Sequence, residues 1–160
     1  LSCRVGSPPL DSVTRERIYA RYTYLLSLQG YPGEVIGMEY KPEPTETTGK
    51  PDKKRDELKG KVLVLKDLVS YQDGTVASRM IINRNAGSIT LFSFDEDEGL
   101  SEHTAPYDAV VMILEGECEV WVAGKTFRMK EGETIIFPAN APHALSAITR
   151  FKMMLIMIRE

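Results

Sequence analysis

The sequence is poor in the residues that most often carry chemistry or staple small folds. Its 160 residues contain only two cysteines, Cys3 and Cys118, and two histidines, His103 and His143. A disulfide-stabilised secreted fold normally shows four or more cysteines at short spacings, so we interpret both cysteines as unpaired thiols in a reducing compartment. CxxC pairs and Cys/His zinc clusters are also absent from the sequence.

Long apolar runs and an excess of positive charge are missing as well. Nowhere do 18 apolar residues follow one another, so we expect no membrane-spanning helix. Lys and Arg number 20 against 23 Asp and Glu, and no basic stripe is present, which argues against nucleic acid as a partner. The first ten residues lack the charged start and apolar stretch of a signal peptide, so we expect a cytoplasmic protein.

The first 60 residues differ in character from the rest of the chain. A helix with an aromatic-rich apolar face is expected over about residues 12–28, ending at Gly30. Residues 41–59 are rich in Pro, Thr and charge, and they have too little apolar surface to offset their ordering entropy. We therefore expect an N-terminal extension (1–60) that contains this helix and a polar linker or arm, followed by a β-domain (61–160).

After residue 60, short runs rich in Val, Ile, Phe and Thr alternate with turn residues, which predicts a β-sandwich or barrel. The predicted strands are Val62–Leu65, Ser78–Asn83, Ser88–Phe94, Ala109–Leu114, Glu117–Val122, Thr126–Met129, Thr134–Phe137 and Phe151–Ile158.

Two of these strands have consequences for assembly. Both alternating faces of Ala109–Leu114 are apolar, and Phe151–Ile158 is nearly as apolar throughout. A sheet with one face in water would carry polar residues on that face, so a second layer must cover these strands. A homodimer is the favoured explanation, with the N-terminal helix or a second sheet of the same chain as alternatives.

The segments around the two histidines resemble the paired motifs of the cupin superfamily. Gly132, Pro138 and His143 match the second motif at its spacing, with Asn140 where a glycine often stands, and the first motif ends at Gly116. The resemblance covers about residues 60–160 and implies a mainly β fold, a double-stranded antiparallel β-barrel (jelly roll). The chain is also similar to small single-domain prokaryotic cupins of unassigned activity, and this fold hosts enzymes, sensors and storage proteins.

The resemblance also assigns the four usual metal ligands of the superfamily to positions in this chain. These positions are His103, Ala105, Ala109 and His143, so that two of the four are alanine. Tight binding of a divalent metal ion usually requires three or more protein ligands. Asp108, Glu102 or Tyr107 would therefore have to complete the site. The sequence does not distinguish Zn, Fe, Mn and Ni as the metal.

A ligand site inside the barrel is therefore expected at His103, Tyr107 and His143. His143 is a candidate general acid or base because the pKa of a histidine lies near neutrality, and Tyr107 is a candidate to orient a carbonyl or carboxylate. One hypothesis is a barrel that binds a small polar organic molecule, with or without a metal. As an enzyme, it would resemble oxidoreductases, isomerases or lyases. The alternative is a non-catalytic binding or sensor module without metal.

Overall fold

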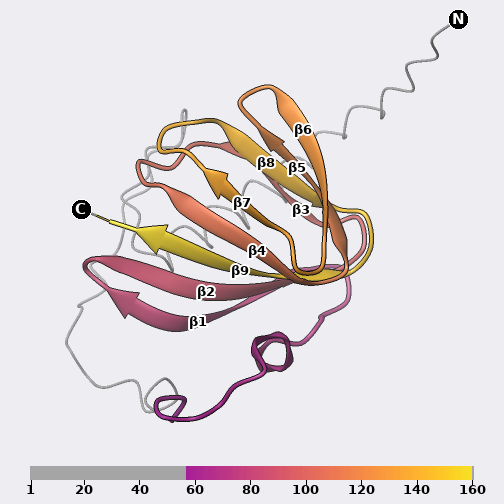
Figure 1. The fold of residues 1–160 in the computed structure, drawn as a ribbon. Coiled ribbons are helices and arrows are strands. Elements are labelled where there is room, and N and C mark those ends of the chain that lie inside the picture. The colour runs from indigo at the N-terminus through magenta and orange to yellow at the C-terminus, as the bar shows by residue number, and fades with distance from the viewer. Residues whose placement is uncertain (1–56, 160) are drawn as a thin grey trace, which may run out of the picture. The chain divides into compact units, whose positions relative to one another are not determined.

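The computed structural model describes residues 57–159, and these form two antiparallel β-sheets (Figure 1). A short 3-10 helix, η1 (Leu65–Leu68), precedes the strands. The strands of this range are β1 (Val76–Arg84), β2 (Gly87–Phe94), β3 (Gly99–His103), β4 (Ala109–Glu115), β5 (Glu117–Val122), β6 (Lys125–Lys130), β7 (Thr134–Phe137), β8 (His143–Ala147) and β9 (Phe151–Ile158). The predicted mainly β fold is confirmed. The helix predicted over residues 12–28 and most of the predicted linker over 41–59 lie outside the described residues, so these predictions and the division at residue 60 stay predictions.

The order of strands places the two segments that are apolar on both faces inside the larger sheet, with a partner strand on each side. One sheet has the order β1-β2-β9-β4-β7, and the other has the order β3-β8-β5-β6. The last strand, β9, therefore lies between β2 and β4 in the middle of the larger sheet, and β4 has β9 and β7 on its two sides.

Within residues 57–159, no helix has the length and apolar character that crossing a membrane requires.

The strand prediction is wrong at one place and incomplete at two others. Val62–Leu65 is not a strand: Val62 is fully exposed, Val64 is 57% exposed, and the segment leads into η1. Apolar β-branched residues predict a strand only where a partner strand is at hand. The short strands β3 and β8 were not predicted, because their few apolar residues stand among polar ones, and they form by pairing with each other.

The core lies between the two sheets. In β4, Ala109, Val111 and Ile113 are at most 3% exposed, whereas the alternating residues on the outer face are only half-buried. The second sheet thus covers only the inner face. On the outer face, directly paired aliphatic residues form a stripe across all five strands of the larger sheet: Ile82, Ile89, Ile156, Val110 and Ile136.

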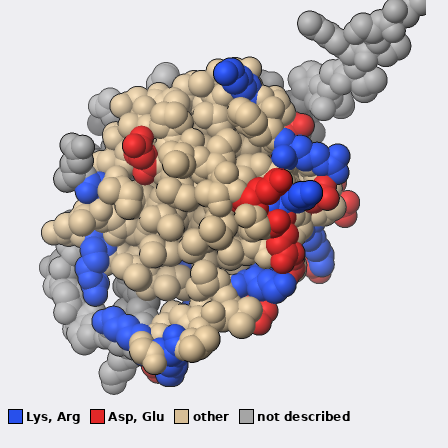
Figure 2. Space-filling view, in the orientation of Figure 1, with Lys and Arg blue, Asp and Glu red and all other residues tan. Residues whose placement is uncertain are grey.

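The two ends of this outer stripe are in contact with solvent. Ile82 is 44% exposed and Ile136 is 61% exposed. In Figure 2 most charged side chains lie towards the edges of the view, most densely on the right, and the surface over β9 and β4 in the middle is largely uncharged. We refer to these five aliphatic residues below as the outer stripe.

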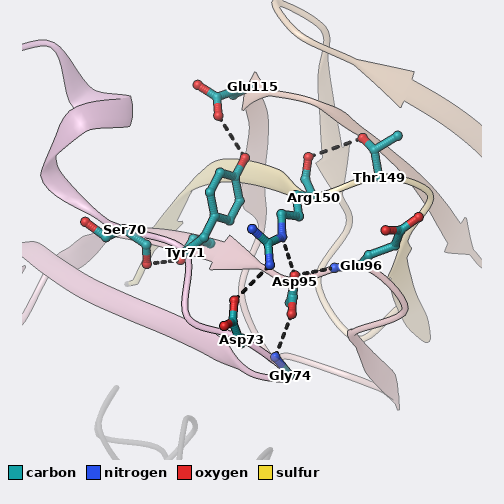
Figure 3. A network of polar contacts seen from close by, with 10 residues as sticks. Ser70, Tyr71, Asp73, Gly74, Asp95, Glu96, Glu115, Thr149 and Arg150 are labelled. Atoms are coloured by element: carbon teal, nitrogen blue, oxygen red, sulfur yellow. Dashed lines mark hydrogen bonds and ion pairs between the residues drawn. The ribbon is translucent and has the colours of Figure 1, made fainter.

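A polar network fastens the segment before β1 to one end of the larger sheet (Figure 3). The Tyr71 hydroxyl donates a hydrogen bond to Glu115, at the end of β4 (2.9 Å). Arg150 forms ion pairs with Asp73 and Asp95, and Asp95 also accepts a hydrogen bond from the Gly74 backbone N–H. Since Ala109 begins β4 and Glu115 ends it, the network lies at the opposite end of that strand from the histidines described next.

Candidate functional site

The barrel brings the two histidines of the chain into contact. His103 ends β3 and His143 begins β8, and the two residues are directly paired across the antiparallel ladder. Their ring centroids lie 4.2 Å apart in an edge-to-face arrangement, with 68° between the ring planes. His143 is 4% exposed and His103 is half-buried. The shared location expected for these two side chains is therefore what the structure has.

The same local geometry orients both imidazoles. The Nδ1 atom of His103 lies 2.7 Å from the carbonyl oxygen of Ser101, and that of His143 lies 2.8 Å from the carbonyl oxygen of Ala141. A carbonyl oxygen only accepts hydrogen bonds, so Nδ1 of each ring carries the proton and donates it. In the neutral form, each ring therefore keeps the lone pair on Nε2, where it can accept a hydrogen bond or a proton.

Burial keeps both rings uncharged near neutral pH. The pKa of His103 falls from 6.5 to about 4, chiefly because burial disfavours the charged imidazolium, and secondly because His143 lies beside it. Its hydrogen bond to the Ser101 carbonyl opposes this shift only in part. Burial likewise lowers the pKa of His143. The pair is thus a neutral acceptor of hydrogen bonds.

Small and aromatic side chains surround the pair. The ring of Phe137, the last residue of β7, lies 4.4 Å from the ring of His143. Phe137 is paired with Ala109 of β4, and both are buried. Ala105 is buried too, and its carbonyl oxygen accepts a hydrogen bond from the Asn140 backbone N–H (2.6 Å). The two alanines that replace metal donors therefore point inward and leave their positions without a coordinating atom.

The remaining predicted site residues lie in or beside the loop that joins β3 and β4. Tyr107 is half-buried in this loop, between the end of β3 and the start of β4, so strand alternation does not fix the direction of its side chain. Glu102 and Asp108 are exposed, and Asp108 accepts a hydrogen bond from the backbone N–H of Ala139 (2.8 Å). No three His, Cys, Asp or Glu side chains among residues 57–159 are grouped so that they could hold a metal ion. Within this part of the chain, the donor set therefore does not fit a divalent metal centre.

The loop before β8 keeps a feature of the second cupin motif without its glycine. Asn140 stands where a glycine is common and has a φ of +62°. Asparagine is among the residues that tolerate this left-handed backbone best. The turn that leads into His143 is therefore retained.

Two further polar residues of the barrel interior were not predicted from the sequence. The hydroxyl groups of Ser88 and Thr90 in β2 are buried and have no hydrogen-bond partner in the described part of the chain. The strand itself was predicted, and alternation within it places Ser88 and Thr90 on one face. That face points to the interior because Ser88 is paired with Met157 and Thr90 with Leu155, on the inner face of β9. The sequence signal that could have identified them is a pair of polar residues on the buried face of an otherwise apolar strand.

Comparisons with known proteins agree with this architecture. The cupin domain family matches residues 90–159. A conserved Streptococcus pyogenes protein, described as of unknown function, is 38% identical, with a TM-score of 0.61 over 63% of this chain and 89% of its own. A cupin superfamily protein from Desulfitobacterium hafniense is 27% identical, also with a TM-score of 0.61, over 63% of this chain and 93% of its own.

A third structure adds a relative with a named domain type. The cupin 2 conserved barrel domain protein from Leptotrichia buccalis is 39% identical over 59% of this chain and 46% of its own length, with a TM-score of 0.57. No protein among the curated ones matches the chain. The two-sheet barrel, the retained motif residues and these relatives lead to one conclusion: the chain belongs to the cupin superfamily.

Proposed function

We propose that this cupin barrel binds a small polar organic molecule at the His103–His143 pair and needs no metal to do so. The observation that carries the proposal is the contact of the two rings, 4.2 Å apart, with both Nδ1 protons directed at backbone carbonyls. The two neutral imidazoles then keep their Nε2 lone pairs. These accept hydrogen bonds from ligand hydroxyl or amide groups, which favours a binding role.

The composition of the site favours this proposal over a metal-dependent enzyme. Imidazole sites that hold a divalent ion firmly have at least three protein donors, and residues 57–159 bring only the two histidines together. Ala105 and Ala109 are buried where the resemblance expects the other donors, and a methyl group does not coordinate a metal. The oxidoreductase, isomerase or lyase activity that a metal would support is thus the second candidate.

Metal analysis of the purified protein separates the two candidates. The wild type is purified without chelator or affinity metal and analysed by plasma mass spectrometry, beside His143→Ala and the control Glu119→Gln, an exposed residue of β5. Native mass spectrometry of the same samples detects a small molecule that is retained on purification. We expect substoichiometric metal in all three, and a library of small polar metabolites to contain ligands that stabilise the wild type and Glu119→Gln but not His143→Ala.

Near one equivalent of metal in the wild type, lost in His143→Ala, would overturn the metal-free proposal. That result would mean that a third ligand completes the site, and a panel of enzyme assays would follow. A library in which every stabilising compound also stabilises His143→Ala would overturn the placement of the ligand at the histidines.

A further inference from the structure

The inner face of β2 carries two polar groups that the histidine pair does not explain. Ser88 and Thr90 are each 3% exposed, and neither hydroxyl has a hydrogen-bond partner in the described range. A buried hydroxyl without a hydrogen-bond partner destabilises the fold relative to a satisfied one, because it has lost its bonds to water and gained none. Two such groups, two residues apart on one face, therefore destabilise the ligand-free barrel.

A buried serine of the same strand shows the contrast. Ser93 is 1% exposed and points to the other face of β2, where its hydroxyl donates a hydrogen bond to the Ser70 carbonyl oxygen (2.9 Å). The buried hydroxyl of Ser93 therefore has a hydrogen bond within the fold, whereas those of Ser88 and Thr90 have none in the described range. The two hydroxyls without a hydrogen-bond partner are the ones that face the barrel interior.

The strand register connects this pair to the histidine site. Ser88 is paired with Met157, Met157 with Ala109, and Ala109 with Phe137, all on the inner face. This row ends at the ring that contacts His143. Neighbouring strands lie about 4.8 Å apart, so the backbone of Ser88 is roughly 14 Å from that of Phe137, a separation that a small metabolite and the side chains at its two ends can bridge together.

The side chains between the two polar pairs can give way to a ligand. Ala109 is small, and Met157 has an unbranched, flexible side chain that repacks readily. Both are buried, at 3% exposure. A ligand that displaces the Met157 side chain would reach the hydroxyl groups of β2 from the imidazole pair.

We propose that Ser88 and Thr90 form a hydrogen-bonding subsite for an uncharged polyhydroxylated ligand whose other end lies at His103 and His143. This inference rests on the proposed function and adds the class of ligand. The inner-face positions of the larger sheet, as its register assigns them, hold no Lys, Arg, Asp or Glu. Burying a charged ligand there without a counter-charge would be costly, whereas hydroxyl groups of a polyol both donate to and accept from serine and threonine.

The first test uses the ligand-free protein and matched variants. Ser88→Ala and Thr90→Val remove the hydroxyl groups with little change of shape, and Ser93→Ala is the control. We expect the first two variants to keep or raise the Tm, because an unsatisfied group is removed, and Ser93→Ala to lower the Tm by about 4–8 °C. A fall in Tm for Ser88→Ala and Thr90→Val as large as that for Ser93→Ala would overturn the inference, since the hydroxyls would then be structural.

The second test measures binding of defined probes by saturation-transfer NMR. Xylitol and erythritol are the uncharged probes, and xylonate is the matching anion. We expect xylitol to bind the wild type, xylonate to bind much more weakly, and Ser88→Ala and Thr90→Val each to weaken xylitol binding about three- to tenfold. Ser93→Ala should leave the affinity unchanged.

The outcomes distinguish this inference from the proposed function. Loss of xylitol binding in His143→Ala but not in Ser88→Ala or Thr90→Val would overturn the subsite and leave the histidine site intact. Xylonate binding as tightly as xylitol, or no binding of either polyol to the wild type, would overturn the ligand class. The metal and metabolite-library measurements described above judge the histidine site independently of these probes.

Discussion

Acidification is expected to destabilise this barrel through His103. Burial, with the ring of His143 at 4.2 Å, lowers the pKa of His103 from 6.5 to about 4 in the folded protein. In the unfolded chain the ordinary value returns, so the unfolded state binds the proton more tightly. The stabilisation is therefore complete above the unfolded pKa of 6.5 and is lost as the pH falls through 6.5 towards 4.

The size of this effect follows from the difference between the two pKa values. The full difference corresponds to about 3 kcal/mol of unfolding free energy, and the part lost between about pH 7 and pH 5 corresponds to about 2 kcal/mol. Burial also lowers the pKa of His143, so its contribution has the same sign. Hydrogen bonds of the neutral rings to backbone carbonyls are retained over this range, because Nδ1 is protonated in both charge states.

Urea unfolding at several pH values measures this loss. The wild type is compared with His103→Asn, because carboxylate titration contributes to both proteins and cancels in the difference. We expect the variant to lose about 2 kcal/mol less than the wild type between about pH 7 and pH 5. NMR titration of the imidazole carbon shifts of the wild type gives the pKa directly, also where the variant is too unstable to compare. Equal losses in both proteins, or a His103 ring that titrates near its ordinary value of 6.5, would refute the reasoning.

Three further outcomes are expected. Gly116 has a φ of +79°, and a Cβ there would collide with the Arg150 carbonyl oxygen, whereas Gly124 has a φ of +83° and open space around it. Gly116→Ala should therefore lower the unfolding free energy by about 2 kcal/mol or more beyond the loss of about 1 kcal/mol in Gly124→Ala, and equal losses in urea unfolding would contradict this close approach. Cys118 is fully buried, and burial raises the pKa of its thiol to about 12. With the N-terminal cysteine changed to serine, the native protein should not react with a thiol reagent until it unfolds, and rapid labelling of the native state would contradict the burial. The outer stripe and the uncharged surface over β9 and β4 predict a homodimer: light scattering should give about twice 18.0 kDa, Ile136→Lys should return the monomer, and a monomeric wild type would exclude this assembly.

The sequence alone was sufficient for most of the architecture. Runs rich in Val, Ile, Phe and Thr, bounded by turn residues, predict strands wherever a segment is long, as in β2, β4, β5 and β9, and the structure has strands there. The short strands β3 and β8 were not predicted, because their pairing with each other is not encoded in their own composition. The strand prediction for Val62–Leu65 was wrong for the converse reason: the segment has the composition of a strand, but in the described structure it pairs with no other strand.

By itself, the sequence also determined which chemical groups the site can contain. It contains two histidines, and alanines stand at positions 105 and 109 where the superfamily has other donors. Only the tertiary structure decided that the two imidazoles lie 4.2 Å apart, which ring nitrogen carries the proton, and that the hydroxyls of Ser88 and Thr90 face the interior without partners. The physical reason is that alternation assigns each side chain to one face of its own strand, whereas the distance between groups on different strands, and the burial that shifts their pKa values, depend on how the two sheets close over each other.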